Sequence, residues 1–182
     1  MQKSNDEQFV GQYLEGDEKS LEILIKQYLK PIYSFVYRYV GSAADAEDIT
    51  QEVFVRMWRN LKKFDRQKKF KTWLFSIAKN TSIDWLRKKK SIPFSKFDNE
   101  NGQNTIAERI AEPSAPFWLS VDNKNTLNFA LEQLSPKYRA IISYRYNDFT
   151  FREIAQVLGK SINTVKSQYR RALKILKKII GH

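Results

Sequence analysis

The chain of 182 residues contains no cysteine, only six glycines and one histidine, at its last position. The absence of cysteine excludes disulfides, thiolate metal sites and cysteine nucleophiles. With one histidine and no glycine-rich phosphate-binding loop, little catalytic equipment remains, so no enzyme activity, cofactor, metal site or small-molecule substrate is expected. No apolar run approaches the roughly 20 residues that cross a bilayer, and the polar N-terminus is unlike a signal peptide. We therefore expect a cytoplasmic protein that does not span a membrane.

Charge of one sign is in excess. The chain has 32 Lys and Arg against 20 Asp and Glu, a formal charge of +12. Such an excess favours a polyanionic partner, either nucleic acid or an anionic membrane surface. The basic residues gather in two blocks, residues 61–91 and 126–182, which a mildly acidic stretch separates. Two contacts with one nucleic acid would produce this pattern, and so would two basic helix faces that merely point to solvent.

Most of the remaining sequence has helical periodicity. Apolar residues recur at a spacing of about 3.6 within residues 21–40, 46–61 and 73–85. Pro31 interrupts the first of these runs and is expected to kink or divide it. The second run counts Trp58 among its apolar stripe. No strand pattern is convincing, so the sequence predicts an all-α fold.

Turn and linker signals divide the chain. The segment FDRQKKF, residues 64–70, has no period and is predicted to be a loop. Residues 92–123 contain three prolines among Ser, Asn, Gln and acidic residues, which is typical of a flexible linker. We therefore predict two small helical domains, residues 1–91 and 124–182. A linker of about 30 residues reaches about 100 Å when extended, at roughly 3.3 Å per residue.

The C-terminal domain contains the pattern of a helix-turn-helix. The segment TFREIAQVLGKSINTVKSQYRR begins with Thr150 and Glu153 as a helix start, turns at Gly159 and starts a second helix at Ser161. Subtracting the apolar stripe leaves a polar and basic outer face that suits bases and phosphates. An ordinary helical hairpin with a solvated basic face is the alternative.

Three segments carry a resemblance to a known family. DAEDITQEVFVRMWRNL and FKTWLFSIAKNTSIDWL resemble region 2 of bacterial RNA polymerase sigma factors, and EIAQVLGKSINTVKS resembles region 4. With only these two regions, the chain is similar to the extracytoplasmic-function (ECF) class, group 4 of the sigma-70 family. The resemblance implies a stress-response sigma factor that binds core RNA polymerase and promoter DNA and is held by an anti-sigma factor. Residues 1–91 would then be the region 2 domain and residues 124–182 the region 4 domain, joined by the linker 92–123.

The resemblance also assigns roles to individual residues. The residues expected to bind polymerase are Asp45, Asp48, Gln51, Glu52 and Arg56. Those expected to recognise and melt the −10 element are Phe64, Lys68, Lys69, Lys71, Trp73, Lys79 and Asn80. Those expected to read the −35 element are Asn163, Thr164, Lys166, Ser167, Gln168, Arg170, Arg171 and Lys174.

Simpler explanations compete with these roles. Acidic residues near a helix start also complement the helix dipole, which explains Asp45 without a partner. Trp73 and Trp85 lie on an apolar stripe and can be core residues. Many relatives have glycine where this chain has Asn163 and a basic residue where it has Gln168, so the promoter sequence is not inferred. A conventional helix-turn-helix activator or repressor that is no polymerase subunit is the alternative function.

Overall fold

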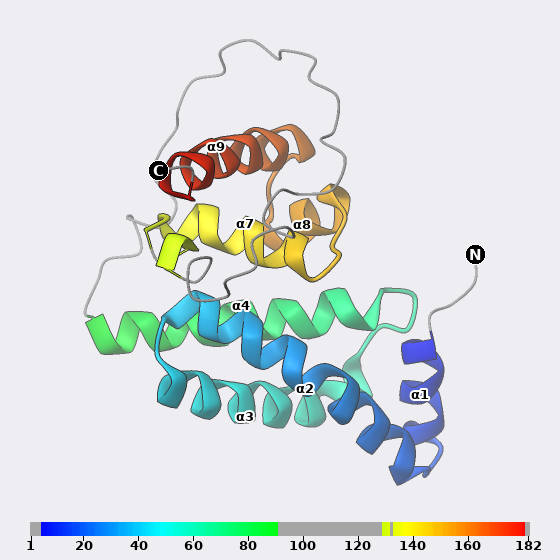
Figure 1. Cartoon of the computed structure of the whole chain (residues 1–182). Coiled ribbons are helices and arrows are strands. Elements are labelled where there is room, and N and C mark those ends of the chain that lie inside the picture. The colour runs from blue at the N-terminus through cyan, green and yellow to red at the C-terminus, as the bar shows by residue number, and fades with distance from the viewer. Residues whose placement is uncertain (1–4, 91–128, 132, 181–182) are drawn as a thin grey trace.

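The computed structural model describes residues 5–90, 129–131 and 133–180, and within them all regular secondary structure is helical (Figure 1). The prediction of an all-α fold is therefore confirmed. The predicted linker, residues 92–123, lies outside the described residues.

Four helices and one short 3-10 turn form the N-terminal unit. They are α1 (Asn5–Leu14), α2 (Glu18–Val40), α3 (Ala43–Asn60), η1 (Leu61–Lys63) and α4 (Phe70–Lys90). Helices α2, α3 and α4 pack against one another, and α1 lies against α2 and the start of α4 (Figure 1).

Local residue types account for the end of α2 and the start of α3. Gly41 adopts φ 77° after the last residue of α2, a conformation that glycine reaches without strain. The Ser42 side chain accepts a hydrogen bond from Asp45 N at the start of α3. Pro31 lies inside α2 and does not divide it. Its neighbours Tyr28 and Ile32 are buried in the core, and their packing stabilises the helix across the missing N–H.

Two features of the N-terminal unit differ from the sequence prediction. Helix α1 was not predicted, because its short stripe consists of few apolar residues. Trp58 does not lie in the core: it is 55% exposed, and its indole Nε1 donates to Tyr13 Oη at 2.8 Å. Its neighbour Met57 is fully buried, so the core-facing stripe of α3 is one residue narrower than the pattern indicated.

The C-terminal unit contains α7 (Pro136–Tyr146), α8 (Phe151–Leu158) and α9 (Ile162–Ile180). A reciprocal capping box between Thr150 and Glu153 starts α8, and Gly159 ends it with φ 64°. The Ser161 hydroxyl accepts from Thr164 N at 3.0 Å and caps α9. The predicted helix-turn-helix is thus present in α8 and α9.

The two units pack directly on each other, with α7 against α2 and α8 against α4 (Figure 1). Aromatic rings fill this contact: Tyr144 lies 4.9 Å from Phe35, and Phe149 lies 4.9 Å from Phe75, between ring centroids. All four rings are at most 1% exposed. The two units therefore share one hydrophobic core.

The Tyr144 hydroxyl lies in this shared core without a hydrogen-bond partner among the described residues, and burial raises its pKa well above the usual value. An unsatisfied buried hydroxyl destabilises the folded chain by about 1–3 kcal/mol. We expect Tyr144→Phe, which keeps the ring, to raise the free energy of unfolding by about 1 kcal/mol. Urea denaturation measures this, with Tyr138→Phe on the half-exposed side of α7 as control. A less stable Tyr144→Phe chain would contradict the assignment.

Candidate functional site

The outer face of α9 is polar and basic. Of the eight residues predicted to read the −35 element, six are exposed: Asn163, Thr164, Ser167, Arg170, Arg171 and Lys174. The opposite face packs into the core through Val165, Tyr169, Ala172 and Leu176. The N-terminal half of α9 therefore combines a helix start capped by Ser161 with a row of exposed polar side chains. A recognition helix that enters the major groove of DNA has this arrangement.

The other two predicted residues are half-buried. Lys166 Nζ lies over the ring of Phe151, 5.7 Å from its centroid. The side-chain oxygen of Gln168 is buried, with no hydrogen-bond partner among the described residues. Both side chains thus have part of their polar surface turned toward α8 or the core, which the residue pattern alone did not indicate.

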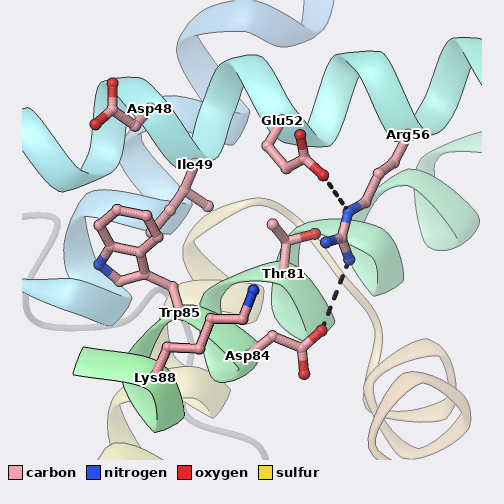
Figure 2. Close-up of a pocket in the computed structure, with 8 residues that line it drawn as sticks. All are labelled: Asp48, Ile49, Glu52, Arg56, Thr81, Asp84, Trp85 and Lys88. Atoms are coloured by element: carbon pink, nitrogen blue, oxygen red, sulfur yellow. Dashed lines mark hydrogen bonds and ion pairs between the residues drawn. The ribbon is translucent and has the colours of Figure 1, made fainter. Parts of the chain in front are cut away.

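A groove between α3 and α4 gathers most of the residues predicted to bind polymerase. Asp48, Glu52 and Arg56 line it from α3 (Figure 2). Arg56 is held on both sides, by Glu52 with Nε–Oε1 at 2.7 Å and by Asp84 with Nη1–Oδ2 at 3.6 Å. Asp48 is exposed and points away from this ion-pair cluster (Figure 2).

Sequence reasoning missed the α4 side of this groove. Asp84, Trp85 and Lys88 line it opposite α3 (Figure 2). The signal was present: Asp84 is the one acidic residue among seven charged positions between Lys71 and Lys90, which singles it out for a specific partner. Trp85 is half-buried, and its indole Nε1 is buried with no hydrogen-bond partner in the described part of the chain.

The aromatic residues predicted for the −10 element form a packed set at the start of α4. Phe64 is 7% exposed, and its ring lies 4.9 Å from Trp73 and 5.8 Å from Phe70. Trp73 is half-buried, whereas Asn80 is exposed about two turns further along α4. The basic residues Lys68 and Lys69 lie on the exposed loop that connects Phe64 to Phe70.

Three of the predicted −10 lysines contact the C-terminal unit. Lys69 Nζ pairs with Glu153 Oε1 at 2.7 Å, Lys71 Nζ donates to Asn147 O at 2.6 Å, and Lys79 Nζ donates to Val157 O at 3.3 Å. The partners belong to the end of α7 and to α8. In this arrangement the helix-turn-helix unit covers part of the surface that was predicted to meet opened DNA.

The Lys69–Glu153 pair is an ion pair between the two units. Partial burial acts to raise the pKa of Glu153, but hydrogen bonds from Lys69 and Thr150 outweigh burial and hold that pKa below its ordinary value of 4.5. The ionised carboxylate is therefore the favoured form at neutral pH.

Two negative findings concern only residues 5–90, 129–131 and 133–180. No group of three or more His, Cys, Asp or Glu there could hold a metal ion. No helix in that part of the chain is long and apolar enough to cross a membrane.

A capped helix-turn-helix with a basic outer face, packed on a second helical unit, defines an all-α DNA-binding protein. Family models agree with this class: sigma-70 region 2 matches residues 24–92, and sigma-70 region 4 matches residues 125–176.

Relatives and solved structures agree as well. The chain is 34% identical to the ECF RNA polymerase sigma factor SigW of Bacillus subtilis over 93% of each chain, and 30% identical to the ECF RNA polymerase sigma-E factor of Escherichia coli over 92% of this chain and 90% of that one. The solved structure of CnrH in complex with the cytosolic domain of CnrY has a TM-score of 0.70 at 20% identity, over 97% of both chains. The sigma factor RpoE of Bartonella quintana, in complex with the anti-sigma factor NepR, has a TM-score of 0.69 at 22% identity, over 90% of this chain and 98% of that one.

The chain belongs to the ECF class of RNA polymerase sigma factors. It is a polymerase-associated factor for promoter-specific transcription initiation, and the members of its family are not enzymes. The alternative of a conventional activator or repressor is not favoured.

We expect Glu153→Gln to loosen the contact between the units. Glutamine still serves the capping box of α8 but loses the charge that pairs with Lys69. Fluorescent dyes on cysteines introduced at the exposed positions Lys62 and Lys177 would report this change as lower energy transfer at neutral pH. The lost ion pair should reduce the free energy that holds the units together by a few tenths to about 1 kcal/mol. We call the packing of the two units on each other the closed arrangement. The ion pair stabilises it at pH values above the ordinary carboxyl pKa, and this stabilisation is lost as the pH falls through the lowered pKa of Glu153. In acid, the energy transfer of the wild type should therefore fall to that of Glu153→Gln.

The matched control is Glu22→Gln, which breaks an exposed ion pair with Lys26 inside α2. Equal energy transfer in wild type and Glu153→Gln at neutral pH would show that the ion pair does not hold the units together.

Proposed function

We propose that this sigma factor uses three separate surfaces during initiation. The α3 side of the groove binds core polymerase, the loop of residues 64–70 with α4 reads and opens the −10 element, and α9 reads the −35 element. The observation that carries this proposal is the exposed polar face on α9, with its capped N-terminus, in a chain of the sigma family. The site of action is the cytoplasm, together with the polymerase.

Reading of the −35 element follows from the geometry of α9. Thr164, Ser167 and Arg170 are exposed near one face, at helical spacing. An arginine reaches the O6 and N7 atoms of a guanine with two hydrogen bonds, which distinguishes one base pair from the others. Lys174 and Lys177 lie further along the helix and are also exposed, so they contact phosphates and give affinity that does not depend on sequence.

Docking on polymerase is assigned to the exposed polar residues of α3. Asp48 and Gln51 are exposed and free of core packing. Glu52 forms an ion pair with Arg56, which neutralises its charge, whereas Asp48 exposes a negative charge to solvent. Asp48 is therefore the acidic residue through which a basic surface of the polymerase is steered and held.

Promoter binding requires the two units to separate. Two promoter elements more than two duplex turns apart lie roughly 70–80 Å from each other, at about 34 Å per turn. The packed units bring Lys69 within 2.7 Å of Glu153 in the helix-turn-helix, so one molecule in this arrangement cannot occupy both elements. Release also frees Lys71 and Lys79 for the DNA backbone.

An anti-sigma factor is the regulator we propose for this chain. The support is the family itself and two solved structures of the same fold. One is RpoE in complex with the anti-sigma factor NepR, and the other is CnrH in complex with the cytosolic domain of CnrY.

For the polymerase contact, we expect Asp48→Lys to weaken binding to core polymerase by tenfold or more, since a like charge inside an interface costs about 1–3 kcal/mol or more. Glu47→Lys is the matched control, because it makes the same charge change at the neighbouring exposed position of α3. Equilibrium binding of the labelled sigma factor to core polymerase measures both. Equal losses in the two variants would mean that net charge matters and that Asp48 is no specific contact.

For the −35 contact, we expect Arg170→Ala to change which −35 sequence is preferred, at a cost of about 1–3 kcal/mol at one base pair. Lys177→Ala should lower transcription from all promoters alike and reduce the salt dependence. Transcription by reconstituted holoenzyme over a panel of single −35 substitutions separates the two. Arg170 is a backbone contact if its variant scales every promoter by the same factor.

A further inference from the structure

Two acidic residues at the start of α1 are nearly buried, with Asp6 7% and Glu7 9% exposed. Buried carboxylates are tolerated only where hydrogen bonds replace water. Asp6 accepts from Tyr28 Oη at 2.6 Å and from Gln27 Nε2 at 3.0 Å. Glu7 Oε1 accepts from the backbone N–H of Phe70 at 2.8 Å, across 63 residues of sequence. The pair therefore joins α1 both to α2 and to the start of α4.

Glu7 serves as a cap for a helix to which it does not belong. Phe70 is the first residue of α4, and the first N–H groups of a helix have no partner inside it. The carboxylate supplies the missing acceptor, and its charge also complements the positive end of the helix dipole. The point at which the loop of residues 64–70 ends and α4 begins is thus fixed by a contact from α1.

Asp6 supports the other end of the same loop through aromatic rings. The ring of Tyr28, whose hydroxyl Asp6 holds, lies edge-on to Phe70 with 5.6 Å between centroids. Phe70 in turn contacts Phe64, where the loop begins, at 5.8 Å. Burial and the hydrogen bond to Asp6 both raise the pKa of Tyr28, so its hydroxyl keeps the proton that it donates.

A third contact of α1 lies in the middle of the loop. A side chain on Gly11 would bring its Cβ within 3.2 Å of Arg66 Nη1, so the arginine passes close over the bare backbone of α1. Between its two ends the loop makes a local turn, in which Asp65 accepts from the backbone N–H groups of Gln67 and Lys68 at 3.0 and 2.9 Å, and Lys69 pairs with Glu153 of the C-terminal unit. When the C-terminal unit moves away and the Lys69 pair is lost, the contacts of α1 and the packing of Phe64 on Trp73 remain to place the loop.

We infer that α1 positions the loop that reads the −10 element, and that Glu7 is a positioning residue for base recognition there. The inference rests on the proposed −10 role of the loop. Side chains that read an unpaired base discriminate between bases only if they are held within about 0.5 Å of the right position. Glu7 never touches the DNA: it fixes the first turn of α4, between the loop lysines and Asn80. Its loss lowers discrimination between bases more than it lowers affinity.

The variants separate the charge, the hydrogen bond and the loop contact. Glu7→Gln keeps an acceptor for Phe70 N but loses the charge, so we expect a loss of base discrimination of about threefold; Glu7→Ala loses both, and we expect about tenfold. Gly11→Ala leaves the carboxylate in place and shifts the end of the exposed Arg66 side chain by a few tenths of an ångström, so it tests the same positioning by another contact and should cause a smaller loss than Glu7→Gln. Glu22→Gln, an exposed carboxylate of α2, is the matched control and should leave discrimination unchanged.

The measurement uses reconstituted holoenzyme and single-stranded DNA. A randomised library first yields the preferred non-template −10 sequence, and binding is then measured for it and for each single-base substitution. Wild type must discriminate between bases and Asn80→Ala must lose that discrimination; if either fails, the proposed −10 role of this region is wrong. Once both results hold, the α1 variants test whether α1 positions the loop.

A purely structural role predicts a different result. In that case Glu7→Ala would lower the melting temperature, polymerase affinity and −35 discrimination together with −10 discrimination. Positioning predicts that −10 discrimination falls alone, in the order Glu7→Ala, Glu7→Gln, wild type, with Gly11→Ala also reduced. Wild-type −10 discrimination in Glu7→Ala and Gly11→Ala, or a parallel loss of −35 discrimination, overturns the inference. If Glu7→Ala does not fold, Glu7→Gln and Gly11→Ala decide between the two.

Discussion

The aromatic contact between α7 and the N-terminal unit is the interaction on which the observed arrangement depends. Tyr144 and Phe149 are buried against Phe35 and Phe75, and this packing brings the lysines of the loop and of α4 onto the helix-turn-helix unit. The same contact also buries polar atoms that have no hydrogen-bond partner in the described chain, including the Tyr144 hydroxyl and Arg38 Nη1, although the Arg38 guanidinium as a whole lies 3.7 Å over the Tyr146 ring. Such atoms offset part of the free energy gained from apolar burial. The packing of the two units is therefore less stable than the buried aromatic area alone indicates.

Local sequence signals predicted those parts of the fold that depend on a few neighbouring residues. The capping box of Thr150 and Glu153, the turn at Gly159 and the cap at Ser161 were all read correctly, because each is a contact within one turn of helix. The family resemblance is confirmed by the comparisons. The roles of individual site residues stay predictions, since they depend on contacts with DNA and polymerase.

Long-range contacts are what the sequence could not supply. Glu7 looks like an ordinary acidic residue in a first helical turn until its hydrogen bond to Phe70 N is seen, 63 residues away. Trp58 fits the apolar stripe of α3 by spacing, yet it lies at the edge of that stripe and is exposed. Likewise, the family resemblance and its positive charge assign Lys69 to DNA, whereas in this structure Lys69 pairs with a carboxylate of the other unit.

The closed arrangement does not cover the three proposed surfaces equally. Asp48 and Gln51 on α3 are exposed, and so are Thr164 and Arg170 on α9. By contrast, Lys71 and Lys79 are half-buried and donate to backbone carbonyls of the C-terminal unit. Given the proposed roles, polymerase docking and −35 reading need no prior rearrangement, while contact with opened −10 DNA does. If these lysines bind phosphates as proposed, DNA competes directly with those carbonyls and with Glu153, and this competition would couple strand opening to separation of the two units.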